Sequence, residues 1–341
     1  MLKKKPHTFM VAILNEKRPH NTGLAKVAVQ CSVEAFVVNQ SLVLLINICG
    51  KNRHLRQARN RYAQPTNTMK LLLILFSLFF SLGGNSQNCF EVHKLKSNVL
   101  KEKRSIWVGL PANYHKDSSY AVVYVLDAEH RFELTYTLTK ELFENQSAIP
   151  EVIVVGIPHI DRFHRINDLT FTDSKVDAKG KEDTIGYFNS SMTGNGLFFL
   201  EFLENEVLPF VNKQFSTNGF NTLMGHSIGG YFCAYILPIQ KSFSAFQIYD
   251  ASIWYNDGNA IKHLQKELDS NYKSNIFISK GAAYDGPREN VDHHLLMIDS
   301  LGTFLSNYPK LTITTATYEK DHNGMYLFSV MDGLTSLFKD E

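Results

Sequence analysis

The segment Asn221–Gly230, with the sequence NTLMGHSIGG, carries the residues best suited to covalent chemistry. It contains a G-x-S-x-G pattern with Ser227 at its centre, which is typical of a sharp strand-to-helix turn that presents a nucleophilic serine. Side chains at Gly225 and Gly229 would collide across such a turn, so the chemistry requires small residues there. The pattern therefore predicts Ser227 as a nucleophile.

The flanking residues fit this turn. An apolar stretch, Thr222–Met224, precedes it, and an apolar run compatible with a helix, Tyr231–Leu237, follows and ends at Pro238. The N-terminus of that helix would bring backbone N–H groups and the positive end of its dipole to the reacting carbonyl. The alternative is a glycine-rich turn with an idle serine.

A nucleophilic serine needs a general base, and His322 is the predicted one. It lies in the loop Glu319–Gly324, directly after the last expected strand, where the order serine, acid, histidine places the base. Three other histidines follow Ser227, and they lie in helical stretches where surface positions are expected: His263, His293 and His294.

The acid is expected after the strand Asn275–Ser279, in the loop Lys280–Glu289. Asp285 is preferred because the turn-forming Gly286 and Pro287 follow it, and Glu289 is the alternative. Asp321, the neighbour of His322, is a poor candidate because adjacent side chains rarely face each other. The acid would fix the imidazole tautomer and stabilise the imidazolium.

The oxyanion of an acyl-transfer intermediate needs two N–H donors. The backbone N–H of Ile228, which follows the nucleophile, is one. The second is expected after the strand Tyr120–Leu126, from Ala128 or from Asp127.

Strand and helix signals alternate along residues 88–341. The expected strands are two between Phe90 and Pro111 (the second at Arg104–Leu110), then Tyr120–Leu126, Glu151–Ile157, the strand before Ser227, Phe243–Tyr249, Asn275–Ser279 and Leu311–Tyr318. Helical stretches are expected up to about Asn145 and at Gly196–Val211, Asp292–Tyr308 and Gly324–Lys339. This alternation predicts a single α/β domain with a mostly parallel central sheet and helices on both faces.

Two segments are expected to lack regular structure. Residues 158–170 are dense in charged residues and histidines and are expected to form a loop, and the polar segment Thr172–Thr193 is expected to run over the surface. In parallel sheets the active groups gather at the carboxyl ends of the strands, where such loops lie.

The first 86 residues differ from the rest. Met69–Lys70, the apolar run Leu71–Leu82 and the small-residue sequence Gly83–Ser86 form a signal-peptide pattern, so the mature domain is expected at residues 87–341. An apolar run of this length is short for a membrane span of about 20 residues, although an uncleaved anchor is the alternative. Residues 1–68 are interpreted as a mis-called extension, or else as a basic disordered tail.

The charge of the chain belongs mostly to this leading part. The whole chain has a net charge of +2, but residues 71–341 hold 23 Lys and Arg against 31 Asp and Glu, a net charge of −8. The basic balance is therefore no argument for nucleic-acid binding. Cys89 and Cys233 are the cysteines of the mature domain, and neither C-x-x-C nor H-E-x-x-H spacing occurs, so no metal or cofactor is expected.

The sequence resembles the esterase family of α/β-hydrolases that includes esterase D and the enterochelin esterases, and most of all its periplasmic, salmochelin-esterase-like branch. The matching segments are Val152–Ile157 with Arg165 and Asp168–Thr170, Gly225–Gly230, Tyr249–Tyr255, Asp321–Gly324 with Tyr326, and Asp332–Leu334. The resemblance implies an α/β-hydrolase fold and hydrolysis of carboxylic esters, with Ser227 and His322 as catalytic residues.

The resemblance also places His226, Trp254 and Arg165 at the substrate pocket. Trp254 could instead be a core tryptophan beside the site, and Arg165 could form a buried ion pair with Asp168. The family acid follows a glycine after the penultimate strand, whereas Gly281 is followed here by two alanines.

The predicted function is a periplasmic or secreted serine esterase that works through an acyl-enzyme. The expected substrate is a siderophore ester or an acyl ester on a polysaccharide. No nucleic-acid partner and no stable membrane span of the mature protein are expected. The alternatives are a non-catalytic binding module on the same fold and an acyltransferase.

Overall fold

The computed structural model describes residues 90–173, 192–283 and 288–339. The chain divides into two units, Met1–Gln87 and Asn88–Glu341. The predicted extension at residues 1–68, the predicted signal peptide at 69–86 and most of the expected surface segment 172–193 lie outside the described residues.

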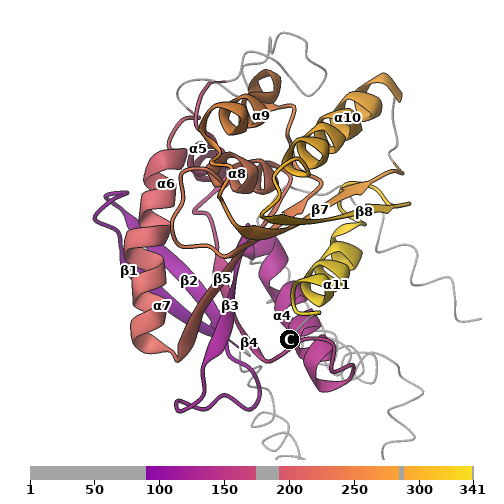
Figure 1. Ribbon diagram of the computed structural model, residues 1–341. Coiled ribbons are helices and arrows are strands. Elements are labelled where there is room, and N and C mark those ends of the chain that lie inside the picture. Colours follow the sequence, from indigo (N-terminus) through magenta and orange to yellow (C-terminus); the bar gives the residue numbers. More distant parts are fainter. Residues whose placement is uncertain (1–89, 174–191, 284–287, 340–341) are drawn as a thin grey trace, which may run out of the picture. The chain divides into compact units, whose positions relative to one another are not determined.

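The second unit is built on one eight-stranded sheet (Figure 1). Its strands are β1 (Glu91–Lys96), β2 (Lys103–Gly109), β3 (Tyr120–Leu126), β4 (Val152–Ile157), β5 (Thr217–His226), β6 (Ala245–Tyr249), β7 (Ser274–Gly281) and β8 (Leu311–Tyr318). They are arranged in the order β1-β2-β4-β3-β5-β6-β7-β8. The β1–β2 and β2–β4 pairs are antiparallel and the other pairs are parallel. The predicted α/β fold with a mostly parallel sheet is confirmed.

Helices cover both faces of this sheet. They are α4 (Ala128–Glu144), α5 (Arg162–Asp168), α6 (Gly196–Phe202), α7 (Leu208–Gln214), α8 (Ile228–Ile236), α9 (Tyr255–Glu267), α10 (Arg288–Leu305) and α11 (Tyr326–Leu337). In Figure 1, α4 and α11 lie together on one side of the sheet, and α8, α9 and α10 lie on the other. None of the helices among the described residues combines the length and hydropathy that crossing a bilayer requires.

Strand β3 shows why this sheet has two cores. All seven of its side chains are buried, and alternate residues belong to different apolar clusters. Val122 and Tyr124 pack with the layer that contains α8, whereas Val123 and Val125 pack with α4 and α11. Side chains alternate across a strand, so a continuous apolar run is what a strand covered on both faces requires.

Two helical regions differ from the expectation. The expected helix Gly196–Val211 is continuous but contains a π-helical turn, Leu203–Val207, between α6 and α7. Pro209 follows this turn and has no N–H to donate to the preceding turn, which accounts for the altered hydrogen-bond pattern. Residues 158–170 are not all loop, because α5 forms there and the Asp161 carboxylate caps it by accepting from Phe163 N and His164 N.

The close packing of α4 on β4 leads to a testable prediction. A methyl group on Gly156 of β4 would stand 2.6 Å from the Phe132 ring and 2.8 Å from Ala128 Cβ, both on α4. We expect Gly156→Ala to destabilise the protein by about 1–3 kcal/mol, since extra volume in a packed core forces the backbone to shift. Denaturant unfolding measures this change.

Gly302 of α10 provides the matched control. A methyl group there would come no closer than 3.7 Å to the Thr315 methyl, which is ordinary contact. Gly302→Ala should therefore gain up to about 1 kcal/mol from helix propensity. Equal effects of the two substitutions would contradict the packing argument.

Candidate active site

Ser227 lies on a strained turn between β5 and α8. Its backbone has φ 61° and ψ −121°, a left-handed conformation that is uncommon for a residue with a side chain. Backbone hydrogen bonds to the end of β6 and to the loop after it hold the turn. Ser227 N donates to the Tyr249 carbonyl, and Ser252 N donates to the Ser227 carbonyl, each at 3.0 Å. Ser227 is half-buried, and its Oγ lies 3.4 Å from Ser252 Oγ.

The glycines around Ser227 permit this turn. A methyl group on Gly225 would stand 2.2 Å from the Gly229 carbonyl oxygen, a contact that backbone atoms cannot relieve. A methyl group on Gly230 would stand 2.8 Å from Ala251 Cβ. The strand and the helix therefore approach each other closely at Gly225 and Gly230. A methyl group on Gly229 would come no closer than 3.4 Å, to Asp127 Oδ2, so the collision expected at that glycine does not occur.

His322 lies in the loop between β8 and α11, and a hydrogen bond fixes that loop next to the serine turn. Nε2 of His226, the residue before Ser227, donates to the His322 carbonyl oxygen at 2.6 Å. The two imidazole centroids are 4.3 Å apart. Asp321 stabilises the turn itself, because its Oδ1 accepts from Asn323 N and Gly324 N at 3.2 and 2.6 Å.

The carboxylate that contacts His322 belongs to Asp250. His322 Nδ1 lies 2.6 Å from Asp250 Oδ2, and Asp250 is fully buried at the end of β6. Its Oδ1 accepts from Gly281 N at 3.0 Å. Asp285, the expected acid, lies outside the described residues, as does the side chain of Glu289.

A second histidine lies on the same carboxylate. His294 Nε2 is 3.3 Å from Asp250 Oδ1, and His294 is buried, in contrast to the surface position expected for it. Burial alone would raise the pKa of Asp250, but hydrogen bonds and charge from His294 and His322 outweigh it and hold that pKa below its ordinary value. Asp250 is therefore ionised at neutral pH.

These three residues could also hold a cation. One donor atom from each of Asp250, His294 and His322 lies within 4.8 Å of the others. Two imidazoles and a carboxylate suit a divalent transition metal. The same atoms join these residues to one another, so a metal ion would compete with the hydrogen bond between His322 and Asp250.

His226 is positioned by protein partners on both ring nitrogens. Burial, together with the nearby His322 and Arg131, holds the pKa of His226 well below its ordinary value, so the ring is neutral. Because Nε2 carries the proton that it donates to His322, Nδ1 accepts from Arg131, whose Nη2 lies 3.1 Å away. Arg131 also donates to Asn323 Oδ1 at 2.9 Å. His226 thus joins α4, the serine turn and the histidine loop.

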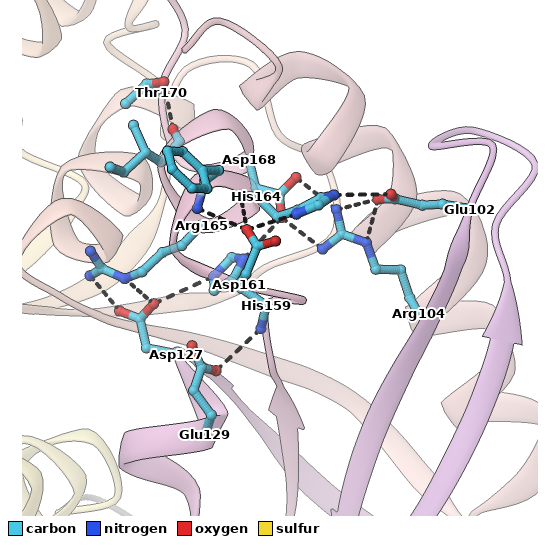
Figure 2. Close-up of polar contacts among 12 residues, drawn as sticks. Glu102, Arg104, Asp127, Glu129, His159, Asp161, His164, Arg165, Asp168 and Thr170 are labelled. Atoms are coloured by element: carbon cyan, nitrogen blue, oxygen red, sulfur yellow. Dashed lines mark hydrogen bonds and ion pairs between the residues drawn. The ribbon is translucent and has the colours of Figure 1, made fainter. Parts of the chain in front are cut away.

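The structure shows the contacts of the two other residues expected at the pocket, Trp254 and Arg165. Trp254 is half-buried and packs against the larger apolar core. Arg165 does not pair with Asp168; it donates to both carboxylate oxygens of Asp127 at 2.6 and 2.8 Å. Asp168 instead accepts from Arg104 at 2.7 and 2.9 Å and lies 2.9 Å from His159 Nδ1 (Figure 2).

Two helices begin beside Ser227 without a side-chain cap. β3 and β5 are neighbours in parallel register, and α4 and α8 start directly after them, at Ala128 and Ile228. Neither helix receives a side-chain hydrogen bond at its N-cap residue. The first N–H groups of a helix have no partner within the helix, so two donors are available at this edge of the sheet.

The sheet order and the serine at a strand–turn–helix junction define an α/β-hydrolase. Residues 97–286 match the family Esterase, described as "Putative esterase", and the chain belongs to this family. It is therefore a carboxylic ester hydrolase, and the alternative of a non-catalytic binding module is not supported.

Several solved structures share this fold. An IroE-like serine hydrolase from Shewanella oneidensis is 28% identical with a TM-score of 0.64, over 74% of this chain and 80% of that one. The siderophore hydrolase EstA from Aspergillus nidulans is 18% identical (TM-score 0.61; 75% and 96% covered). The enterobactin esterase FES from Shigella flexneri is 17% identical (TM-score 0.59; 74% and 59% covered). None of the curated proteins compared with the chain matches it.

The neutral state of His226 makes stability depend on pH. The unfolded chain takes up a proton at this residue near its ordinary pKa of about 6.5, whereas the folded protein does not. The contribution of His226 to stability is therefore fully present above that pH and is lost as the pH falls. We expect the unfolding free energy of the wild type, minus that of His226→Gln, to decrease by up to about 1.4 kcal/mol per pH unit below pH 6.5.

Denaturant unfolding of both proteins at several values between pH 7.5 and 5 measures this difference. Because all other histidines are common to the two proteins, the difference isolates residue 226. A difference that stayed constant or increased toward pH 5 would show that the ring is protonated in the folded state.

Proposed function

We propose that Ser227, His322 and Asp250 form the catalytic triad of this esterase. The observation that carries the proposal is the 2.6 Å contact between His322 Nδ1 and the buried Asp250 carboxylate, in a loop bound to the residue before Ser227. An ionised carboxylate on Nδ1 leaves Nε2 as the basic nitrogen, which is the tautomer that a general base needs.

In this mechanism Ser227 Oγ attacks the ester carbonyl carbon while His322 Nε2 takes its proton. The oxyanion accepts hydrogen bonds from the N–H groups of Ile228 and Ala128. Protonated His322 then gives its proton to the leaving alkoxide, and the acyl-enzyme remains. Water, deprotonated by His322, attacks the acyl-enzyme and releases the carboxylic acid and Ser227.

Ala128 is preferred to Asp127 as the second donor. Ala128 is the first residue of α4, so its N–H points out of the helix end, along the direction in which the helix dipole favours negative charge. Ile228 has the same place in α8. The proposed oxyanion site is therefore formed by two helix N-termini.

We infer that the substrate is a siderophore ester. The similar structures include proteins named as siderophore hydrolases and as an enterobactin esterase, and their folds agree with this one over about three quarters of the chain. An acyl ester on a polysaccharide is the competing substrate and belongs in the same assay.

The proposed triad predicts losses of catalytic activity that differ in size between its members. Ser227→Ala should reduce turnover by about 10⁶-fold, the order found where such triads have been dismantled. Asp250→Asn should reduce kcat by about 10⁴-fold, because an amide favours the wrong imidazole tautomer. Hydrolysis of a catecholate trilactone, a feruloyl glycan and an acetylated glycan measures these losses, and we expect the trilactone to be preferred.

Asp285→Asn is the matched control for the acid. We expect its loss to be much smaller than that of Asp250→Asn, and the reverse order would assign the acid to Asp285. A fluorophosphonate probe provides an independent check, because it should label Ser227 in the wild type and not in His322→Ala. A wild type that neither reacted with the probe nor hydrolysed any ester would overturn the proposal.

We further propose that the enzyme is exported and that its mature chain begins at Gln87. The folded unit Asn88–Glu341 starts directly after this point, and β1 begins at Glu91. N-terminal sequencing of the exported protein should therefore read from Gln87. An intact sequence upstream of Met69 would contradict both the cleavage and the interpretation of residues 1–68.

A further inference from the structure

Asp127 is an aspartate at the N-cap of a helix that it does not cap. Aspartate is among the residues that cap helix N-termini most effectively, and Asp161 does so for α5 with bonds of 2.8 and 2.9 Å. At α4, the Asp127 carboxylate makes no hydrogen bond to the helix. The backbone of Asp127 is left-handed, with φ 56° and ψ 40°, whereas capping residues normally have an extended backbone.

The Asp127 carboxylate is held elsewhere by a buried ionic network (Figure 2). Arg165 contacts both of its oxygens, and His159 Nε2 lies 3.4 Å from Oδ1. The His159 side chain has no exposed surface, and its other nitrogen contacts Asp168. Asp168 is held in turn by Arg104, so the position of Asp127 is determined by side chains from β2, α5 and the end of β4.

This position lies beside both helices of the proposed oxyanion site. Ala128, directly after Asp127, is the first residue of α4. A methyl group built on Gly229, in the first turn of α8, would stand 3.4 Å from Asp127 Oδ2. If a carboxylate so close to both helix ends turned to bind their N–H groups, its negative charge would exclude an oxyanion.

We propose that Arg165 is a positioning residue that holds the Asp127 carboxylate off the N-terminus of α4 and so keeps the oxyanion hole open. This inference rests on the proposed function of Ser227. Bidentate pairing with Arg165 keeps Asp127 left-handed and neutralises a charge that would otherwise oppose the oxyanion. Without Arg165, Asp127 relaxes to the extended backbone and caps its own helix.

The test is a rescue experiment. Arg165→Met should lower kcat for a small ester such as p-nitrophenyl acetate by about 100-fold, the size of effect seen when one oxyanion donor is lost, and should change KM by less than about threefold. Asp127→Gly in addition should recover at least about a tenth of the wild-type kcat. Glycine adopts the left-handed backbone without strain and has no carboxylate with which to cap the helix.

Arg104→Met is the matched control, because it removes the second arginine of the network but leaves the pair between Arg165 and Asp127 intact. We expect it to lower thermal stability while kcat stays within about threefold of the wild type. Asp127→Gly should give no rescue in that background. If Arg165→Met does not fold, Arg165→Lys and the double variant Arg165→Met with Asp127→Gly take its place. Arg165→Lys keeps a cation beside the Asp127 carboxylate, and the double variant has no carboxylate at position 127.

Three results would overturn the inference: wild-type kcat in Arg165→Met, a double variant no faster than Arg165→Met, or a loss confined to KM. The third would make Arg165 a substrate-binding residue instead. The rate of fluorophosphonate labelling at Ser227 separates this inference from the proposed function. An unreactive wild type refutes the function, whereas a reactive wild type with an equally reactive Arg165→Met refutes only the role of Arg165.

Discussion

At the junction of β5 and α8, the backbone of Gly225 lies so close to that of Gly229 that no side chain fits between them. The helix must therefore begin immediately after the strand, and the residue between them must take a left-handed backbone. The same closeness brings the turn against the end of β6, where Tyr249 and Ser252 bind it through the backbone. The buried Asp250 lies between these two contacts, so the same packing positions both Asp250 and the serine turn.

The electrostatic environment of this turn depends on charged side chains that form ion pairs with one another and not with the helix ends at the turn. Asp127 is buried beside two helix N-termini, and burial would raise its pKa, but the charge and hydrogen bonds of Arg165 lower it to about 2. The carboxylate is thus ionised throughout the neutral range, and its charge is compensated by the arginine and not by the helices. The His226 ring is neutral, so it binds His322 and Arg131 without adding a charge next to His322.

The sequence predicted the sheet, the serine turn and the histidine loop because each leaves a local signal. Apolar runs reveal buried strands, glycines reveal the tight turn, and chain order locates His322. The partner carboxylate leaves no such signal, since both β6 and β7 end in acidic loops at the same edge of a parallel sheet. Asp250 does follow an expected strand directly, which was the available clue. Helix α5 has only seven residues, many of them charged, so it shows no apolar periodicity. Ion pairs such as that between Arg165 and Asp127 could not be predicted, because they depend on tertiary distances.

A carboxylate at the end of β6 has a consequence for how this protein can change. In the proposed triad, Gly281 at the end of β7 donates its backbone N–H to Asp250, and His294 of α10 lies on the same carboxylate. Directly after Gly281, Ala282 and Ala283 contribute backbone N–H groups, which donate to the carbonyl oxygens of Tyr318 and Lys320. A side chain exchanged at Ala282 or Ala283 leaves these backbone bonds, and so the proposed triad, in place.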